Sequence, residues 1–159
     1  MLGGQSPASA QTQESKPKLV DEFNQVTNGY AKAVIDNFIN QFSDDLTSTA
    51  YIIFYRGKTS NGQIYNPKTK EYETKCVLPL KVQAAQKLKF YRNYIITNHR
   101  FDELRLVLID GGYKEKESTE FWLVSAGQEP PKPAPTFEEK DVKFRKKGKI
   151  RKSDILKDC

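Results

Sequence analysis

The sequence has few of the residues that usually carry metal chemistry or catalysis. Its two cysteines, Cys76 and Cys159, are too few and too far apart for a zinc site. Its one histidine, His99, follows a predicted helix, where a lone histidine is typically a solvated cation favoured by the helix dipole. We therefore expect no metal, no cofactor and no enzymatic activity.

Long apolar runs are also absent. No window approaches eighteen consecutive apolar residues, so the sequence predicts no membrane-spanning helix. The chain of 159 residues is long enough for one domain with a core and too short for two domains of ordinary size.

Most of the chain lacks an excess of positive charge. The net charge is +6, yet residues 140–157 alone carry nine Lys or Arg against Asp141 and Asp154; Asp158 brings this to +6 for residues 140–159, so residues 1–139 have no net charge. A balanced domain has no excess of cations with which to follow phosphates. We therefore place the candidate contacts to an anionic surface in this basic tail, at Lys146, Lys147 and Arg151.

The amino terminus, "MLGGQSPASAQTQESKPKL", is small and polar. The "ASA" before Gln11 resembles the site at which a signal peptide is cut, but no apolar stretch precedes it. Two interpretations stay open: an exported protein whose start was truncated or assigned too far downstream, or an ordinary disordered leader over residues 1–17.

Hydrophobic periodicity predicts two helices and a central strand. Thr27 or Asn28 can cap a helix with apolar residues at helical spacing between Tyr30 and Phe42, and Leu80 to Thr97 repeats the same period. Ala50 to Tyr55 is apolar on both faces, as expected of a central strand. A weaker alternation over Lys18 to Phe23 predicts a short first strand.

A long polar segment, residues 56–79, follows the central strand. It could form a hairpin with Ile64-Tyr65 and Tyr72 on either side of "NPKTKE". Its tyrosines among lysines could equally form a binding surface, and a loop of this length could also be disordered.

The last two apolar runs, Leu104 to Ile109 and Thr119 to Val124, read as an antiparallel pair joined by a turn at Gly111-Gly112. We expect Trp122 to be largely buried in this pair. The carboxylates near the turn are expected to be solvated charges without a catalytic role; they are Asp110, Glu115, Glu117 and Glu120.

The predicted order is β-α-β-α-β-β, an α/β domain (an α+β sandwich) over residues 18–127 with two helices on one face of a mixed sheet. Four prolines within residues 130–135 predict a stiff linker over residues 128–137. We expect this linker to hold the basic tail, residues 138–159, away from the domain.

The order of elements and the segment "LKVQAAQKLKFYRNYIITNHRFDELRLVLIDGGY", Leu80 to Tyr113, resemble the OmpA-like carboxy-terminal domain of bacterial cell envelopes. In that family a helix ending in a Tyr-Leu-like pair runs into a short loop, a strand and a glycine-bearing turn. Tyr94-Ile95 and "FDELRLVLIDGG" occupy those places here. The resemblance covers residues 18–124 and implies a periplasmic or secreted protein.

In that family an aspartate after the second strand and an arginine in the second helix hold the diaminopimelate of peptidoglycan. Lys87 stands at the arginine position, whereas the strand here is followed by Arg56, Gly57, Lys58 and Thr59, with no acid. The resemblance makes Arg56, Lys58 and Lys87 the candidate ligand-binding residues. Without the carboxylate that would pair with the ligand's ammonium, peptidoglycan binding is expected to be weak or absent.

These observations predict an exported, non-catalytic binding or scaffold domain of the cell envelope, with an envelope protein or an anionic polymer as partner. The alternative is nucleic-acid binding through the basic tail, with Tyr65, Tyr72 or Phe144 stacking on bases.

Export would place both thiols in an oxidising compartment, where a bridge between Cys76 and Cys159 could form. Such a bridge would fold the tail back over the domain. Alternatively, Cys76 packs as a small hydrophobic residue, and Cys159 stays free or links to another molecule.

Overall fold

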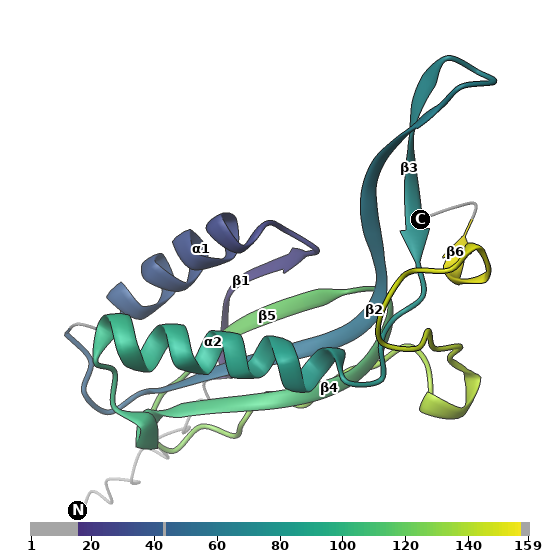
Figure 1. The fold of residues 1–159 in the computed structure, drawn as a ribbon. Coiled ribbons are helices and arrows are strands. Elements are labelled where there is room, and N and C mark those ends of the chain that lie inside the picture. The colour runs from purple at the N-terminus through teal and green to yellow at the C-terminus, as the bar shows by residue number, and fades with distance from the viewer. Residues whose placement is uncertain (1–15, 43, 157–159) are drawn as a thin grey trace, which may run out of the picture.

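The computed structural model describes residues 16–42 and 44–156, with the backbone alone for residues 61–64. The expected leader, residues 1–17, lies almost entirely outside this range. The order of the main elements is β-α-β-β-α-β-β, followed by a short sixth strand (Figure 1). No helix in the described ranges is long and apolar enough to span a membrane.

Four strands form the body of a mixed sheet in the order β1-β5-β2-β4. They are β1 (Lys18–Asn24), β2 (Thr49–Asn66), β4 (Leu106–Lys116) and β5 (Ser118–Val124). β4 runs parallel to β2, whereas β5 is antiparallel to both β1 and β2. Both helices, α1 (Asn28–Asn40) and α2 (Gln83–His99), cover one face of this sheet. The predicted fold class, two helices packed on a mixed sheet, is confirmed.

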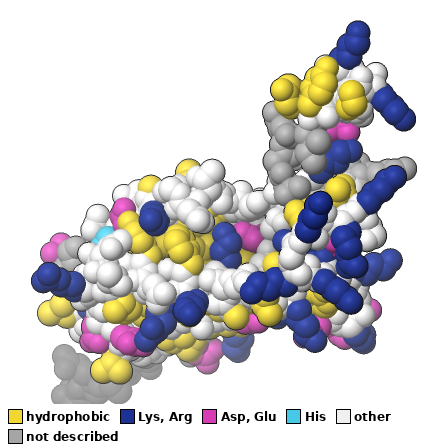
Figure 2. Space-filling model, in the orientation of Figure 1, with side chains coloured by type: hydrophobic (Ala, Val, Ile, Leu, Met, Phe, Trp, Pro, Cys, Tyr) yellow, Lys and Arg dark blue, Asp and Glu magenta, His cyan; other side chains and the backbone are white. Residues whose placement is uncertain are grey.

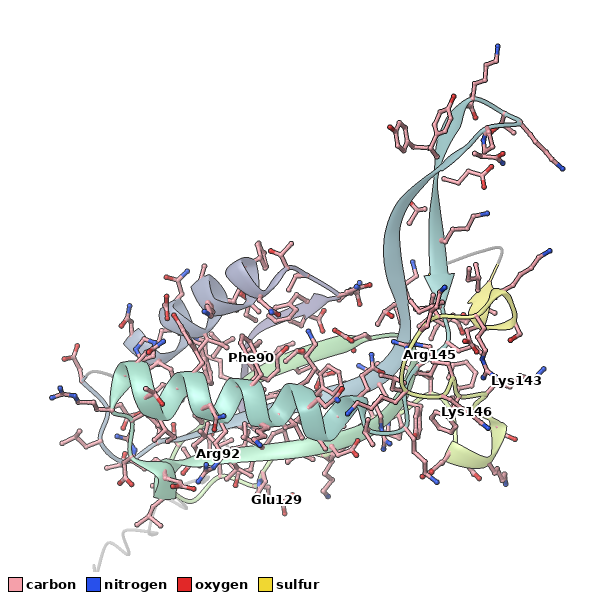
Figure 3. All side chains as sticks on the ribbon, viewed as in Figure 1. Phe90, Arg92, Glu129, Lys143, Arg145 and Lys146 are labelled. Atoms are coloured by element: carbon pink, nitrogen blue, oxygen red, sulfur yellow. The ribbon has the colours of Figure 1, made fainter. Side chains whose placement is uncertain are left out.

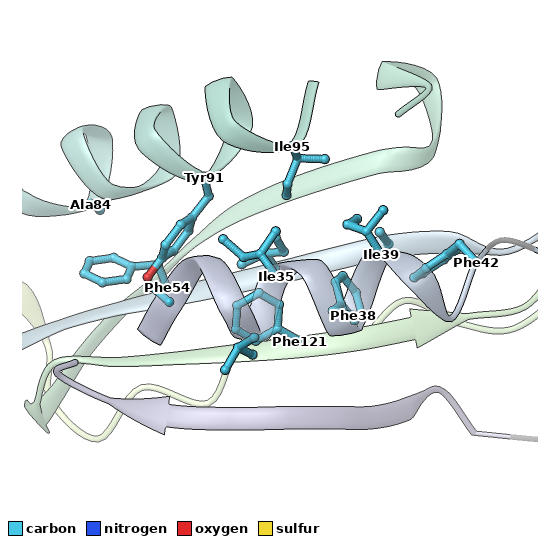
Figure 4. Packing of buried hydrophobic residues seen from close by; sticks show 13 residues of the cluster. Ile35, Phe38, Ile39, Phe42, Phe54, Ala84, Tyr91, Ile95 and Phe121 are labelled. Carbon is cyan, nitrogen blue, oxygen red and sulfur yellow. The ribbon is translucent and has the colours of Figure 1, made fainter. Parts of the chain in front are cut away.

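The main core lies between the helices and the sheet (Figure 4). Phe121 of β5 is central to it, with its ring 5.2 Å from Phe38 of α1 and 6.3 Å from Tyr91 of α2. α1 begins where the sequence predicts, because the Thr27 hydroxyl accepts a hydrogen bond from the backbone N–H of Tyr30. The apolar stripes of the two predicted helices therefore pack as expected.

The predicted pairing of the last two strands is wrong. β4 and β5 do not pair with each other, because β2 lies between them. β4 runs parallel to β2, so the chain between them, which contains β3 and α2, forms the crossover connection that a parallel pair requires. β5 then occupies the other edge of β2, where it also meets β1.

The expected turn at Gly111-Gly112 is also wrong, since both glycines lie inside β4. A Cβ atom at Gly111 would lie 2.6 Å from the ring of Tyr55, so the neighbouring strand requires a glycine at this position. Trp122, expected to be largely buried, is only partly buried; its indole N–H donates to Glu120 at 3.0 Å.

The chain passes from β4 to β5 by crossing β2 at Gly57. The backbone N–H of Glu117 donates to the carbonyl of Lys58 at 3.1 Å. A Cβ atom at Gly57 would lie 2.3 Å from the carbonyl carbon of Lys116 and 2.5 Å from the nitrogen of Glu117. Only glycine allows the two backbones to approach this closely. We call this place the strand crossing.

Beyond the strand crossing, β2 continues into a ribbon with β3 (Glu71–Val77), which confirms the hairpin interpretation of residues 56–79. Tyr65 and Tyr72 are direct partners across this ribbon. The short strand β6 (Ile155–Leu156) pairs with the base of β3, at Cys76 and Val77.

The proline-rich segment does not act as a spacer. It lies on the sheet face opposite the helices, where the backbone N–H of Ala134 donates to the Tyr55 hydroxyl at 3.1 Å. Thr136 donates its backbone N–H to Tyr113 at 2.8 Å, and Tyr113 pairs with Phe137. Ile53 and Tyr55, on this face, are fully buried. The expectation that the linker holds the tail away is therefore wrong, because apolar residues on this face require a cover.

The tail is packed on the domain through residue 156. The backbones of Arg145 and Leu80 pair in an isolated parallel β-bridge. The backbone N–H of Leu78 donates to the backbone carbonyl of Asp154 at 3.0 Å. Cys76 is disulfide-bonded. Its predicted partner, Cys159, lies outside the described residues, so the pairing of Cys76 with Cys159 stays a prediction.

Replacing Gly57 by alanine should destabilise the protein by about 3 kcal/mol or more, because the new methyl group must displace the backbone of the strand crossing. Urea unfolding of the purified variant measures this change. Gly29→Ala is the matched control: no atom lies within 4 Å of a Cβ placed there, so the helix should gain about 0.5–1 kcal/mol. A Gly57→Ala variant as stable as the wild type would contradict the role of the crossing.

Candidate functional site

The three predicted ligand-binding cations, Arg56, Lys58 and Lys87, all lie near the strand crossing, but each is paired with a different carboxylate. The structure therefore does not join them into one cationic site. The carboxylates come from β4 and from its connection to β5, the region that the sequence analysis treated as a solvated turn.

Arg56 ties the beginning of α2 to the sheet. Its Nη2 atom lies 2.8 Å from Oδ2 of Asp110, and its Nη1 atom donates to the carbonyl of Lys81 at 3.0 Å. The guanidinium carbon lies 4.2 Å from the centre of the Tyr113 ring. Arg56 Nε is buried and has no hydrogen-bond partner among the described residues. These contacts make Arg56 a structural anchor more than a free ligand-binding group.

Lys87 faces Glu117, a carboxylate that the sequence predicts to be solvated. Its Nζ atom lies 3.5 Å from Oε1 of Glu117, and Gln83 donates to Oε2 of the same carboxylate at 2.5 Å. Glu117 is 4% exposed. The sequence gives no acid directly after the run Ala50 to Tyr55, but the strand crossing brings Glu117 of the β4–β5 connection beside α2.

Tyr91 completes this polar cluster on the helix side. Its hydroxyl lies 3.0 Å from Oγ1 of Thr119. Burial raises the pKa of Tyr91 to about 12, and the nearby charge of Glu117 acts in the same direction.

A second buried carboxylate, Glu120, organises the opposite face of the sheet. Trp122 and Tyr55 donate to its Oε2 atom at 3.0 and 3.2 Å, and Lys114 lies 2.8 Å from Oε1. Lys114 also lies over the Tyr55 ring, 3.8 Å from its centre. Burial raises the pKa of Tyr55 to about 12. The expectation that Glu117 and Glu120 are solvated is therefore wrong, because the chain crosses the middle of the sheet there.

The charged side chains around the strand crossing pair with one another and stabilise the fold, and His99 is paired in the same way. His99 lies at the other end of α2, with Nε2 2.7 Å from Oδ1 of Asp36. In the described part of the chain, no three or more His, Cys, Asp and Glu side chains are arranged to hold a metal ion.

Lys58 lies on the other side of the strand crossing, paired with Glu115. It lines a cleft of about 270 Å³ between the crossing and the C-terminal segment. The charged lining is completed by Lys114, Asp141 and Lys143. The other walls are mostly apolar, from Leu78, Pro79, Phe137, Val142 and Leu156.

The strongest concentration of charge is the stretch 143–152, which we call the basic segment. It holds seven cations in ten residues and no acid: Lys143, Arg145, Lys146, Lys147, Lys149, Arg151 and Lys152. All except Arg145 are exposed. Figure 2 shows Lys and Arg side chains gathered over this part of the molecule, and Figure 3 labels Lys143, Arg145 and Lys146 within it.

Arg145 anchors the basic segment. Its side-chain Nε donates to the carbonyl of Leu78 at 3.1 Å, and its backbone N–H donates to Pro79 at 3.0 Å. Phe144 packs on Tyr113, with ring centres 5.4 Å apart, and is therefore not free to stack on a base. Arg151 lies 3.5 Å from the buried Asp154. These contacts leave the lysines pointing outward.

The predicted contacts Lys146, Lys147 and Arg151 are therefore all exposed in the basic segment, to which the structure adds the exposed Lys143, Lys149 and Lys152. The run of Lys and Arg in the sequence is sufficient to predict that these three further lysines are exposed. The burial of Glu117 and Glu120 had no comparable signal, because it depends on where β4 crosses β2.

Alkaline pH should destabilise the protein through its two buried tyrosines. Tyr55 and Tyr91 have a pKa of about 12 in the fold against an ordinary value of 10. Their contribution to the free energy of unfolding is complete below pH 10 and is lost as the pH rises from 10 towards 12, because the unfolded chain releases these protons first. Urea unfolding at about pH 8 and about pH 11 measures this loss.

The loss should be smaller in Tyr55→Phe and unchanged in Tyr72→Phe, since Tyr72 is exposed. A Tyr55→Phe profile that falls as steeply as that of the wild type would contradict this assignment.

Comparisons with models of protein families, with curated proteins and with solved structures found no match to this chain. The site is therefore interpreted from its own residues and contacts.

Proposed function

We propose that the protein is an exported, non-catalytic domain of the bacterial cell envelope that binds an anionic polymer through the basic segment. The observation that carries this proposal is the folding of seven cations, with no acid among them, against the domain. A surface held in place loses less conformational entropy on binding than a disordered tail does.

Two observations support an extracytoplasmic location. The first is the "ASA" sequence near the amino terminus, which has the small-residue pattern of a signal-peptide cleavage site. The second is the disulfide bond at Cys76, because disulfides persist mainly in oxidising compartments.

The resemblance to the OmpA-like domain supports a scaffold of this kind, with two helices on one face of a mixed sheet. At the position that the family uses for diaminopimelate, however, Lys87 is paired with Glu117 of the same chain. Opening that pair would leave the buried carboxylate with the hydrogen bond from Gln83 but without its cation, which is unfavourable. The proposed polymer contact therefore lies on the basic segment.

Muramyl peptides that contain diaminopimelate should bind with a dissociation constant weaker than about 1 mM, because Lys87 and Glu117 satisfy each other. Isothermal titration calorimetry is the measurement. Low-micromolar binding that is lost in Lys87→Ala and retained in Lys89→Ala, an exposed position on the same helix, would show that the pair opens for a ligand.

Polyphosphate tests the proposed function, because it supplies linear negative charge without other groups. The protein should bind it with an affinity that falls steeply as salt rises. A variant of the basic segment should lose at least tenfold in affinity; its substitutions are Lys146→Gln, Lys147→Gln, Lys149→Gln and Lys152→Gln.

The matched control removes the same number of exposed lysines elsewhere: Lys16→Gln, Lys18→Gln, Lys89→Gln and Lys132→Gln. It should bind nearly as well as the wild type. Equal losses in both variants would mean that only net charge matters, and no binding by the wild type would refute the proposed function.

A further inference from the structure

The ribbon of β2 and β3 projects from the body of the molecule as an arm (Figure 1). We call residues 59–77 the arm. Its strands pair from Thr59 with Val77 to Asn66 with Glu71, beyond the last pairing of β2 with β4 at Lys58. The ribbon is about 25 Å long at about 3.3 Å per residue. Two strands alone are marginally stable in water, so an arm of this length is a feature that needs a role.

Two tyrosines stand together near the tip of the arm. Tyr65 and Tyr72 are direct partners across the ribbon, with ring centres 5.4 Å apart and planes inclined at 60°. Their residues are 50% and 68% exposed. Exposed aromatic pairs of this kind are typical of binding surfaces, because they offer a large rigid apolar area at low entropic cost.

The charge at the tip is positive. Lys68 and Lys70 lie in the turn, are exposed, and form no ion pair within the described residues. The nearby acid Glu73 is already used, since Lys75 lies 2.7 Å from its Oε2 atom and Asn66 donates to its Oε1 atom at 2.6 Å. The tip therefore offers Lys68 and Lys70 beside two aromatic rings, and with the exposed Glu71 residues 65–72 keep a net charge of +1.

One strand edge joins the arm tip to the basic segment. The basic segment leads into β6, and β6 pairs with β3 at Cys76 and Val77. From Cys76, β3 runs to Glu71 near the tip, a distance of about 17 Å. Figure 2 shows Lys and Arg side chains both at the tip, beside hydrophobic side chains, and over the C-terminal part of the chain. An extended polymer could contact both surfaces at once.

We propose that the arm tip is a second contact for the polymer and that this polymer is an acidic polysaccharide. The inference rests on the proposed function and extends it. A polysaccharide of uronic acids carries carboxylates for Lys68 and Lys70 and apolar C–H faces for Tyr65 and Tyr72. Polyphosphate has the charge without the rings.

Nucleic acid also combines charge with flat rings, but the two tyrosines do not form a slot for a base. Their centres are 5.4 Å apart and their planes are inclined, so no base fits between them in parallel stacking. Phe144, the third aromatic residue considered for stacking, packs on Tyr113. The geometry therefore leaves the outer faces of the tyrosine pair for a ring ligand, and titration with a polysaccharide and with DNA decides between a sugar ring and a base.

The experiment compares three polymers of matched charge: polygalacturonate, polyphosphate and single-stranded DNA. Each is titrated into the full-length protein with its disulfide intact, and into three variants. Two variants change both tyrosines at once. One carries Tyr65→Ala and Tyr72→Ala, and the other, called the phenylalanine pair, carries Tyr65→Phe and Tyr72→Phe. The third is the variant of the basic segment described above. Thermal unfolding shows whether each variant is folded.

The variant with Tyr65→Ala and Tyr72→Ala, called the alanine pair, should weaken polygalacturonate binding about tenfold or more, because both rings are removed. It should leave polyphosphate binding unchanged. The phenylalanine pair should bind polygalacturonate within about twofold of the wild type, because the rings are kept. The variant of the basic segment should weaken binding of both polymers.

Three other outcomes would each contradict the arm contact, the polysaccharide assignment or the proposed function. If polygalacturonate binding depends on the basic segment but not on the tyrosines, the arm contact is wrong and the proposed function stands. If the alanine pair weakens DNA binding more than polygalacturonate binding, the ligand is a nucleic acid and the polysaccharide assignment is wrong. If the wild type binds none of the three polymers, both proposals are wrong.

Discussion

The strand crossing is the constraint on which the rest of the structure depends. Because Gly57 lets the β4–β5 connection pass against β2, β5 reaches the free edge of β2 and meets β1. The same passage brings Glu117 to the helix side of the sheet and Glu120 to the other side. One close contact between backbones thus sets both the strand order and the two buried polar clusters.

Local patterns in the sequence predicted the elements well. The helices, the central strand and the hairpin of residues 56–79 are present, because each depends on periodicity or on turn residues within a short window. The surface charge of residues 143–152 was equally readable, since lysines in such a run stay in water wherever the chain goes.

The errors have a common cause, which is the position of one segment relative to another. Thr119 to Val124 is a strand, as the sequence predicts, but its predicted neighbour is wrong, and the predicted exposure of Glu117 and Glu120 is wrong for the same reason. The composition of the proline-rich segment favours extended structure and so predicts a spacer. Its chain is extended, but Ile53 and Tyr55 on the second face of the sheet need a cover that the local sequence does not reveal.

That cover has a consequence for how binding and stability are related. The basic segment is continuous with the chain that shields Ile53 and Tyr55, and it is held in place by Arg145 and β6. A polymer that recognises the ordered segment binds the native state and has less affinity for the unfolded one. Occupancy of the surface and the free energy of unfolding are then thermodynamically linked, so the protein would be most resistant to unfolding where its polymer is abundant.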